Sequence, residues 1–170
     1  MFYKSPADTG YSPDDFNRFD ILRGLEFGSV LDVGSGSCQL QKWLRSLEVE
    51  LEYEAVDIRE DALALCDCRT YTKIPARKKY DLVCLFGVGD YCRPSERAQK
   101  KAEFEELLLT AAKRARSLVV FSAVKPDRKL ANMPQHTFDE VKALAESIGP
   151  DYSIDGDLEP TEFLVTVRLA

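Results

Sequence analysis

The sequence predicts one α/β domain in which helices pack on both sides of a mostly parallel sheet. Its 170 residues, 45% of them hydrophobic, are enough to fill a single core without a metal or a disulfide. Short apolar segments of strand length alternate with amphipathic helical segments, which is typical of β-α-β units. A glycine turn after one strand and an acidic residue at the end of the next indicate a nucleotide-binding site between them.

The first expected element is a helix from Ser12 to about Leu25. Ser12 is a good N-cap, Pro13 suits the first helical position, and two acidic residues follow in the first turn. Residues 1–11 show no periodicity, so we expect them to form a loose N-terminal arm. The apolar stripe of this helix contains Phe16, Phe19, Leu22 and Leu25.

The second expected element is a short buried strand at residues 29–33, followed by a turn. Gly34 and Gly36 give this turn backbone angles and close approaches that a residue with a Cβ disfavours. A helical pattern follows the turn. Its apolar face carries Leu40, Trp43, Leu44 and Leu47.

A second strand, at residues 53–58, supplies an acidic residue at its carboxyl end. Asp57 follows Gly36 by 21 residues, close to the roughly 20 expected for a carboxylate that accepts hydrogen bonds from ribose hydroxyls. Strand, glycine turn, helix and strand therefore form a nucleotide-binding unit.

The turn also narrows the choice of nucleotide. The dinucleotide pattern requires a third glycine where this chain has Gln39, and a phosphate-binding loop would need a lysine that the turn lacks. Asp32 precedes the turn and would repel a diphosphate. S-adenosylmethionine has no phosphate, carries a sulfonium and an ammonium, and keeps the ribose that Asp57 would hold. It is therefore the ligand that we expect.

The remaining elements alternate in the same way. Two further apolar runs, at residues 80–88 and 117–124, are of strand length, not long enough to span a membrane. A helix is expected between them, from Ser95 to Arg116. Its buried face carries Phe104, Leu107, Leu108, Ala111 and Ala115.

The last helix has clear boundaries. Thr137 and Glu140 form a capping-box pattern at its start, and Gly149 followed by proline marks its end. Two further strands are expected after it, at residues 152–154 and 162–169.

The glycine turn, the acid at the end of the second strand and the later strands, in this order, resemble the class I S-adenosylmethionine-dependent methyltransferase family over residues 29 to 124. The family's first motif is matched by Asp32, Gly34 and Gly36, and its second-strand acid by Asp57. The resemblance implies a three-layer sandwich over residues 1–170, with about seven strands and a C-terminal antiparallel pair, and S-adenosyl-L-methionine as cofactor. The cofactor-binding residues implied are Asp32, Gly34, Ser35, Gly36, Asp57, Ile58, Asp67, Cys68 and Phe86.

Two acidic residues in the middle of the chain, Asp67 and Asp81, are expected to have different roles, one in cofactor binding and one in structure. Asp67 is the best match to the family's third motif, an acid near the end of the third strand that contacts the adenine amino group. The stretch between Asp57 and Asp81 is short for the family, so either the second helix or the third strand must be reduced. Asp81 opens the fourth strand and is expected to be structural.

Catalytic candidates belong in the loops after the fourth and fifth strands, beside the expected methyl group. These loops offer Asp90, Tyr91 and Lys125, with His136 further along. The motifs of amino-directed and cytosine-C5 DNA methyltransferases are missing. The Lys-Asp-Lys-Glu set of RNA ribose 2′-O methyltransferases maps loosely onto Lys4, Asp90, Lys125 and Glu162, and this alternative stays open.

Composition favours a small acceptor. The formal net charge of −6 and pI near 4.9 disfavour a nucleic-acid-binding surface. A small-molecule substrate is preferred, a protein substrate is the other option, and little insertion between strands leaves room for a partner subunit. No membrane span or secretory signal is visible, so the expected compartment is the cytoplasm. Five cysteines, an odd number, predict no disulfide framework, and a single histidine disfavours a zinc site.

Three functional hypotheses remain. The first is a methyltransferase enzyme. The second is a non-catalytic S-adenosylmethionine-binding protein, or an inactive partner subunit, of the same fold. The third is an aminopropyltransferase, for which Asp90 is thin support. The methyl acceptor, the modified atom, catalytic competence and oligomeric state stay undetermined by sequence.

Overall fold

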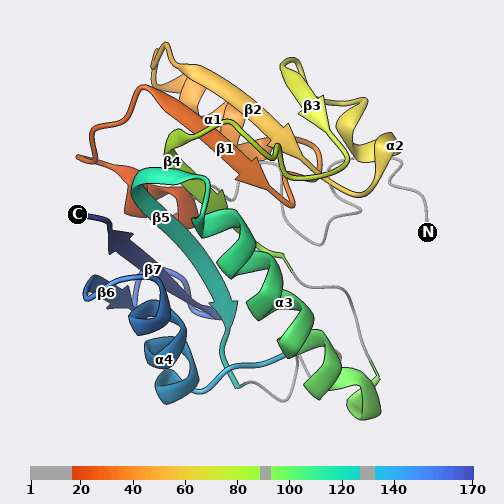
Figure 1. Cartoon of the computed structure of the whole chain (residues 1–170), viewed down its shortest axis with the longest axis vertical. Coiled ribbons are helices and arrows are strands. Elements are labelled where there is room, and N and C mark those ends of the chain that lie inside the picture. Colours follow the sequence, from red (N-terminus) through yellow and green to blue (C-terminus); the bar gives the residue numbers. More distant parts are fainter. Residues whose placement is uncertain (1–16, 89–92, 127–132) are drawn as a thin grey trace.

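In the computed structural model, which describes residues 17–88, 93–126 and 133–170, the strands form a seven-stranded sheet between two layers of helices (Figure 1). The strand order is β3-β2-β1-β4-β5-β7-β6. All neighbours pair in parallel except β5–β7 and β6–β7, which are antiparallel. The predicted three-layer sandwich with an antiparallel C-terminal pair is therefore confirmed. The strands are β1 Ser29–Val33, β2 Glu52–Val56, β3 Arg69–Tyr71, β4 Tyr80–Leu85, β5 Ala115–Val124, β6 Asp151–Asp155 and β7 Glu162–Arg168.

The helices divide between the two faces of the sheet, with α3 and α4 on one face and η2 and α1 on the other (Figure 1). The burial of β1 shows why both faces are covered. Leu31 and Val33 pack toward α3 and α4, whereas Val30 packs with α1, as the two-residue period of a strand requires. The helical segments are η2 Asn17–Leu22, α1 Gln39–Ser46, α2 Glu60–Leu63, η3 Pro94–Glu96, α3 Arg97–Ala112 and α4 Phe138–Ile148.

The N-terminal helix differs from its prediction. Residues 12–16 and the proposed arm at 1–11 lie outside the described residues, and η2 is a 3-10 helix that ends at Leu22. Gly24, with φ of +79°, turns the chain before Leu25. Phe19 and Leu22 are buried as expected.

Helix α3 is shorter than predicted at its carboxyl end. Ala115 opens β5 instead of closing the helix, because its backbone is needed to extend the parallel ladder beside Tyr80. Phe104, Leu108 and Ala111 are buried on the predicted face.

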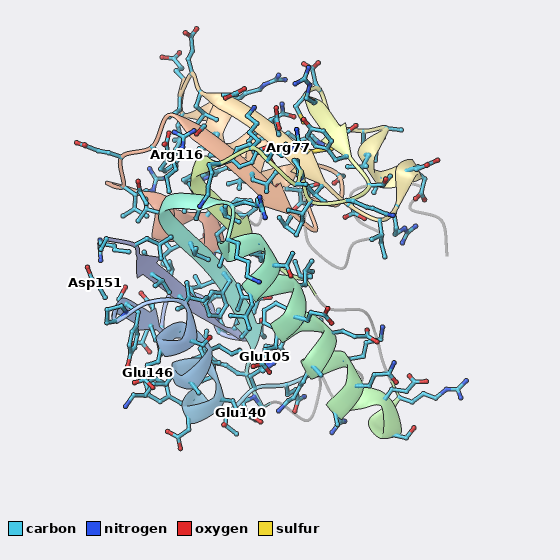
Figure 2. All side chains as sticks on the ribbon, viewed as in Figure 1. Arg77, Glu105, Arg116, Glu140, Glu146 and Asp151 are labelled. Atoms are coloured by element: carbon cyan, nitrogen blue, oxygen red, sulfur yellow. A yellow bond between two sulfur atoms is a disulfide. The ribbon has the colours of Figure 1, made fainter. Side chains whose placement is uncertain are left out.

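The boundaries of α4 are confirmed. Thr137 Oγ1 accepts a hydrogen bond from the Glu140 amide, and the Glu140 carboxylate accepts one from the Thr137 amide. Glu140, labelled in Figure 2, also forms an ion pair with Lys101 of α3 at 2.6 Å. This capping box therefore both starts α4 and links it to its neighbour.

Asp81 is structural, as predicted. Its Oδ2 accepts hydrogen bonds from the Ser29 hydroxyl at 2.9 Å and the Gly28 amide at 3.1 Å. Arg116, labelled in Figure 2, pairs with Oδ1 at 2.6 Å. Led by the Ser29 hydrogen bond, these partners hold the pKa of Asp81 below its ordinary value. They join the start of β1 to the start of β4.

The segment between β2 and β4 is reduced, as its length required. Helix α2 has four residues, β3 has three, and residues 72–79 cross the α3 side of the sheet without a helix (Figure 1). A polar cluster replaces the missing helix there. Burial of Glu54 opposes its ionisation, but donors from Lys78 (2.7 Å), Tyr80 and Tyr71 hold its pKa below the ordinary value.

Neither a membrane-spanning helix nor a metal-binding cluster occurs in the part of the chain that the structure describes. Each helix there is too short or too polar to cross a bilayer. The same residues contain no group of three or more His, Cys, Asp or Glu side chains placed to hold a metal ion.

The capping box gives a direct test of the fold. Thr137→Ala removes the acceptor for the Glu140 amide, so we expect the free energy of unfolding to fall by about 1 kcal/mol in urea denaturation. Thr137→Ser keeps the acceptor and is the matched control, expected within about 0.5 kcal/mol of the parent. Equal losses in the two variants would contradict the capping role.

Candidate functional site

A cavity of about 580 Å³ opens at the carboxyl ends of β1, β2 and β4. Its volume lies within the ~300–1,000 Å³ of small-molecule sites. The connections from β1 and β4 lead to helices on opposite faces of the sheet, which leaves a crevice at the point where the strand order reverses.

The loop after β1 forms the floor of the cavity. The amides of Gly34 and Ser35 both donate to the carbonyl of Val56 at the end of β2, at 2.7 and 3.1 Å. Gly34 has φ of +73°, and a Cβ built on it would lie 2.5 Å from a methyl of Val88. Gly36, with φ of +51°, faces open space. The two glycines thus serve different needs, close packing at Gly34 and an unobstructed turn at Gly36.

Asp57 links the glycine loop to the loop after β2. Its Oδ2 accepts a hydrogen bond from the Gly36 amide and its Oδ1 accepts one from the Arg59 amide, both at 2.9 Å. Each carboxylate oxygen has a second lone pair, so Asp57 can still accept hydrogen bonds from a ligand hydroxyl. The carboxylate is half-buried at the cavity wall.

Asp32 is the buried acid of the cavity. It is 3% exposed, and the hydroxyl of Tyr53 donates a hydrogen bond to its Oδ2. Burial raises the pKa of Asp32 to about 7; the Tyr53 hydrogen bond opposes this rise and the charge of Asp57 adds to it. A cation placed beside Asp32 would favour its ionised form.

Three buried polar atoms at the cavity have no hydrogen-bond partner among the described residues. They are Ser35 Oγ, Ser37 Oγ and Gln39 Nε2. Buried polar groups in native proteins are nearly always paired, so a ligand with donors and acceptors fits here. The Ile58 side chain, 81% exposed, adds an apolar rim next to Asp57. This combination fits an adenosine attached to an amino acid.

The wall opposite the glycine loop is aromatic. Phe86, directly after β4, is 8% exposed and packs edge-on against Phe19 of η2, with ring centroids 5.2 Å apart. Gly87 follows with φ of +63°, and its amide donates to Ser122 Oγ at 2.9 Å. The cavity also contains Phe104 from α3. The site therefore offers apolar surface on which flat groups can pack.

Sequence reasoning missed several cavity residues. Thr72, Lys73 and Ile74, at the carboxyl end of β3, occupy the place predicted for an adenine-binding acid. Arg18 lines the cavity from η2 and forms a buried ion pair with Glu162 of β7 at 3.5 Å. A better placement of the three-residue β3 would have found the first group, but nothing in the sequence pattern indicates the second.

Asp67 and Cys68 do not lie in the cavity, which corrects their assignment to the cofactor site. Both precede β3, so they lie at the opposite end of that strand. The Asp67 carboxylate is 87% exposed and accepts a hydrogen bond from Arg45 at 2.8 Å. Cys68 packs beside Ala55 and Leu63 under α2.

Lys125 is also placed outside the cavity, which removes it as a catalytic candidate. Its Nζ donates to the carbonyls of Gly156, Glu159 (2.8 Å) and Pro160 (3.3 Å), so its donors hold the loop between β6 and β7. Asp90, Tyr91 and Lys4 lie outside the described residues. The Lys-Asp-Lys-Glu set is not assembled by its described members, because Glu162 pairs with Arg18 instead.

His136, the further candidate, is 5% exposed and does not line the cavity. Its ring packs on Phe104 with centroids 5.5 Å apart. Burial, together with Lys101, lowers the pKa of His136 to about 4. It is therefore a neutral core residue at physiological pH.

One disulfide overturns the expectation from cysteine count. Cys38, directly after the glycine loop, is bonded to Cys66, which follows α2. Cys84 is fully buried in β4. The two cysteines are 28 residues apart in the sequence. An odd number of cysteines without a recognised spacing motif does not predict such a pair.

No model of a known protein family matches the sequence, and no curated protein matches it. Solved structures do match. A putative O-methyltransferase from Nostoc punctiforme superposes with a TM-score of 0.67 at 15% identity, over 90% of this chain and 55% of that chain. Magnesium protoporphyrin IX methyltransferase from Synechocystis, with bound S-adenosylmethionine, gives 0.65 at 17% identity, over 92% and 78%. Human N-acetylserotonin methyltransferase, also with S-adenosylmethionine, gives 0.60 at 14%, over 92% and 49%.

These likenesses establish the fold, which is that of the class I S-adenosylmethionine-dependent methyltransferases. The chain spans only about half the length of the Nostoc and human proteins. Fold alone does not fix activity, which depends on the site.

The two glycines should respond differently to an added methyl group. Gly34→Ala adds both positive-φ strain and overlap with Val88, so we expect a loss of about 3 kcal/mol in unfolding free energy. Gly36→Ala, which meets no neighbour, should lose only about 1 kcal/mol. Adding Val88→Ala to Gly34→Ala should recover part of the larger loss; if it recovers none, the predicted overlap is wrong.

Asp32 predicts a pH-dependent stability. Its folded-state pKa near 7 exceeds its unfolded value, so its contribution is full below pH ~4 and is lost as pH rises through ~7. His136, with a pKa lowered to about 4, has the opposite effect, because its contribution to stability increases as pH rises. The isosteric variant Asp32→Asn isolates the acid. Its stability relative to the parent should increase by up to about 1.4 kcal/mol per pH unit between pH ~4 and ~7. Parallel curves in denaturation across this range would contradict the buried-acid assignment.

Proposed function

We propose that this chain is an S-adenosylmethionine-dependent methyltransferase that acts on a small-molecule acceptor. The observation that carries the proposal is the placement of Asp57, which bridges the glycine loop and the loop after β2 and lines the cavity. The fold neighbours support it, because two of them contain the same cofactor.

The proposed cofactor residues divide by the part of the ligand they suit. Asp57 would accept hydrogen bonds from the ribose hydroxyls, and Ile58 would pack on the base. Asp32 and the glycine loop, with Ser35 and Gly36, suit the charged amino-acid end. Phe86 lies where apolar contact with the ligand is available.

S-adenosylmethionine, when bound, supplies an activated methyl group on a sulfonium. The chain's own part is then to orient the acceptor and to exclude water. Phe19, Phe86 and Phe104 provide apolar walls for this purpose. Asp90 and Tyr91, outside the described residues, stay candidates for contact with the acceptor.

A small acceptor fits the cavity better than a polymer does. The cavity has mostly apolar walls and a bounded volume, and the chain carries a net charge of −6. Two structural neighbours carry small molecules, magnesium protoporphyrin IX and N-acetylserotonin, in their names. Lys125 and Glu162, which an RNA 2′-O reaction would use, are held in separate contacts.

The second candidate is an S-adenosylmethionine-binding protein without turnover. One observation favours it: Lys125 and His136, the catalytic candidates among the described residues, do not line the cavity, and Lys125 donates to carbonyls of a loop instead. Formation of S-adenosylhomocysteine on incubation with metabolite extracts separates the two. Binding without product in all extracts would favour the non-catalytic candidate.

Ligand binding is the decisive experiment, and Asp57 provides its control. With S-adenosylmethionine at ~100 times its Kd, thermal unfolding should show stabilisation of about 2.7 kcal/mol. Asp57→Ala should abolish most of this stabilisation. Asp67→Ala makes the same chemical change outside the cavity and should leave it intact. Loss in Asp67→Ala, or no ligand effect on the parent chain, would contradict the proposed site.

A further inference from the structure

Three cysteines gather beside the glycine loop. Cys38 is fully buried, Cys66 is partly exposed, and Cys68 is partly exposed two residues further along. The first two form the disulfide. No role in the proposed methyl transfer accounts for this cluster, since none of the three lines the cavity.

The disulfide joins the end of the glycine loop to the segment between α2 and β3. Cys38 begins α1 immediately after the glycine loop, and Cys66 follows α2. The Asp57 carboxylate accepts a hydrogen bond from the Gly36 amide, so the glycine loop is also attached to the loop that precedes α2. Cys66 Sγ lies 3.7 Å from the carbonyl oxygen of Gly36. A covalent bond and a ligand-binding carboxylate therefore hold one loop from two sides.

Cys38 also has an unusual backbone. Its φ of +57° and ψ of +46° are in the left-handed region, although it is not glycine. Such a residue is strained and persists only where its surroundings hold it. The bond to Cys66 supplies such a hold, and Cys38 sets the direction in which the chain leaves the glycine loop. Opening the bond removes this constraint.

From this arrangement we propose that Cys38 and Cys66 form a thiol–disulfide exchange site that controls cofactor affinity. The reactant is a dithiol reductant. This inference rests on the proposed function, because the controlled ligand is S-adenosylmethionine or its product. The disulfide form binds tightly, and the dithiol form, with a loosened glycine loop, binds weakly.

The exchange balances in two steps. A thiolate of the dithiol attacks Sγ of Cys66, the less buried of the two cysteines, forming a mixed disulfide and releasing the Cys38 thiolate. The amino end of α1 favours that negative charge. The second thiol of the reductant then displaces Cys66 and closes its own disulfide. Two electrons and two protons pass to the protein, which ends with two thiols.

Cys68 does not compete in this exchange. Burial, followed by the charge of Asp32, raises the pKa of Cys68 to about 11, so it stays protonated at physiological pH. Since the thiolate is the attacking species, Cys68 is a poor nucleophile toward the neighbouring disulfide. It is therefore the natural control position.

The test measures S-adenosylhomocysteine binding by calorimetry to the full chain, after air oxidation and after treatment with dithiothreitol. We expect the oxidised chain to have two fewer free thiols than the reduced chain, from the one disulfide. Its affinity should be at least ~5-fold higher, the lower end of typical coupling between sites. Reoxidation should restore it. Cys66→Ser should bind like the reduced parent and ignore the reductant, while Cys68→Ser should respond as the parent does.

The reduction potential of the disulfide gives a second measurement. A disulfide with a purely structural role would keep the same potential when ligand binds. If oxidation lowers the Kd for S-adenosylhomocysteine by a given factor, bound S-adenosylhomocysteine must lower the equilibrium constant for reduction of the disulfide by the same factor. A tenfold coupling lowers the midpoint potential by about 30 mV in a dithiothreitol redox titration. This measurement needs no variant.

The outcomes separate the two proposals. If neither form binds S-adenosylhomocysteine, the proposed function fails. If both bind equally, or if oxidation removes no thiols, the exchange site is overturned while the cofactor site stands.

Discussion

The site depends on the attachment of the loop after β1 to the end of β2. Two amides of this loop donate to one carbonyl, that of Val56, and a third donates to the side chain of Asp57. Because β1 is buried on both faces and paired on both sides, its end cannot move without disrupting the sheet. The direction of α1, the floor of the cavity and the position of the Asp57 carboxylate all follow from this attachment.

Local signals explain most of what the sequence could predict. The spacing from Gly36 to Asp57 identifies two loops that must meet when strands are parallel, and the structure joins them directly. The capping box at Thr137 needs only residues three apart, so it too is visible in sequence.

The failures have two causes, a strand too short to place from its pattern and partners that are distant in sequence. Asp67 precedes β3 instead of following it, because a strand of three residues gives too weak a pattern to place. Lys125 follows its strand as expected, yet carbonyls more than thirty residues away bind its ammonium. Cys38 and Cys66 are adjacent only because α1 and α2 begin and end beside β2.

The charges of the cavity favour a cationic ligand independently of any motif. Asp32 is buried with a single described side-chain donor, Tyr53, and the negative charge of Asp57 adds to the cost of ionising it. A phosphate would increase that repulsion, whereas an ammonium or sulfonium would relieve it. The proposed cofactor site therefore suits a cationic adenosine ligand better than an anionic one. The position of Asp32 before the turn already indicated this preference in the sequence, but its burial, which is the main cause of the raised pKa, became visible only in the folded site.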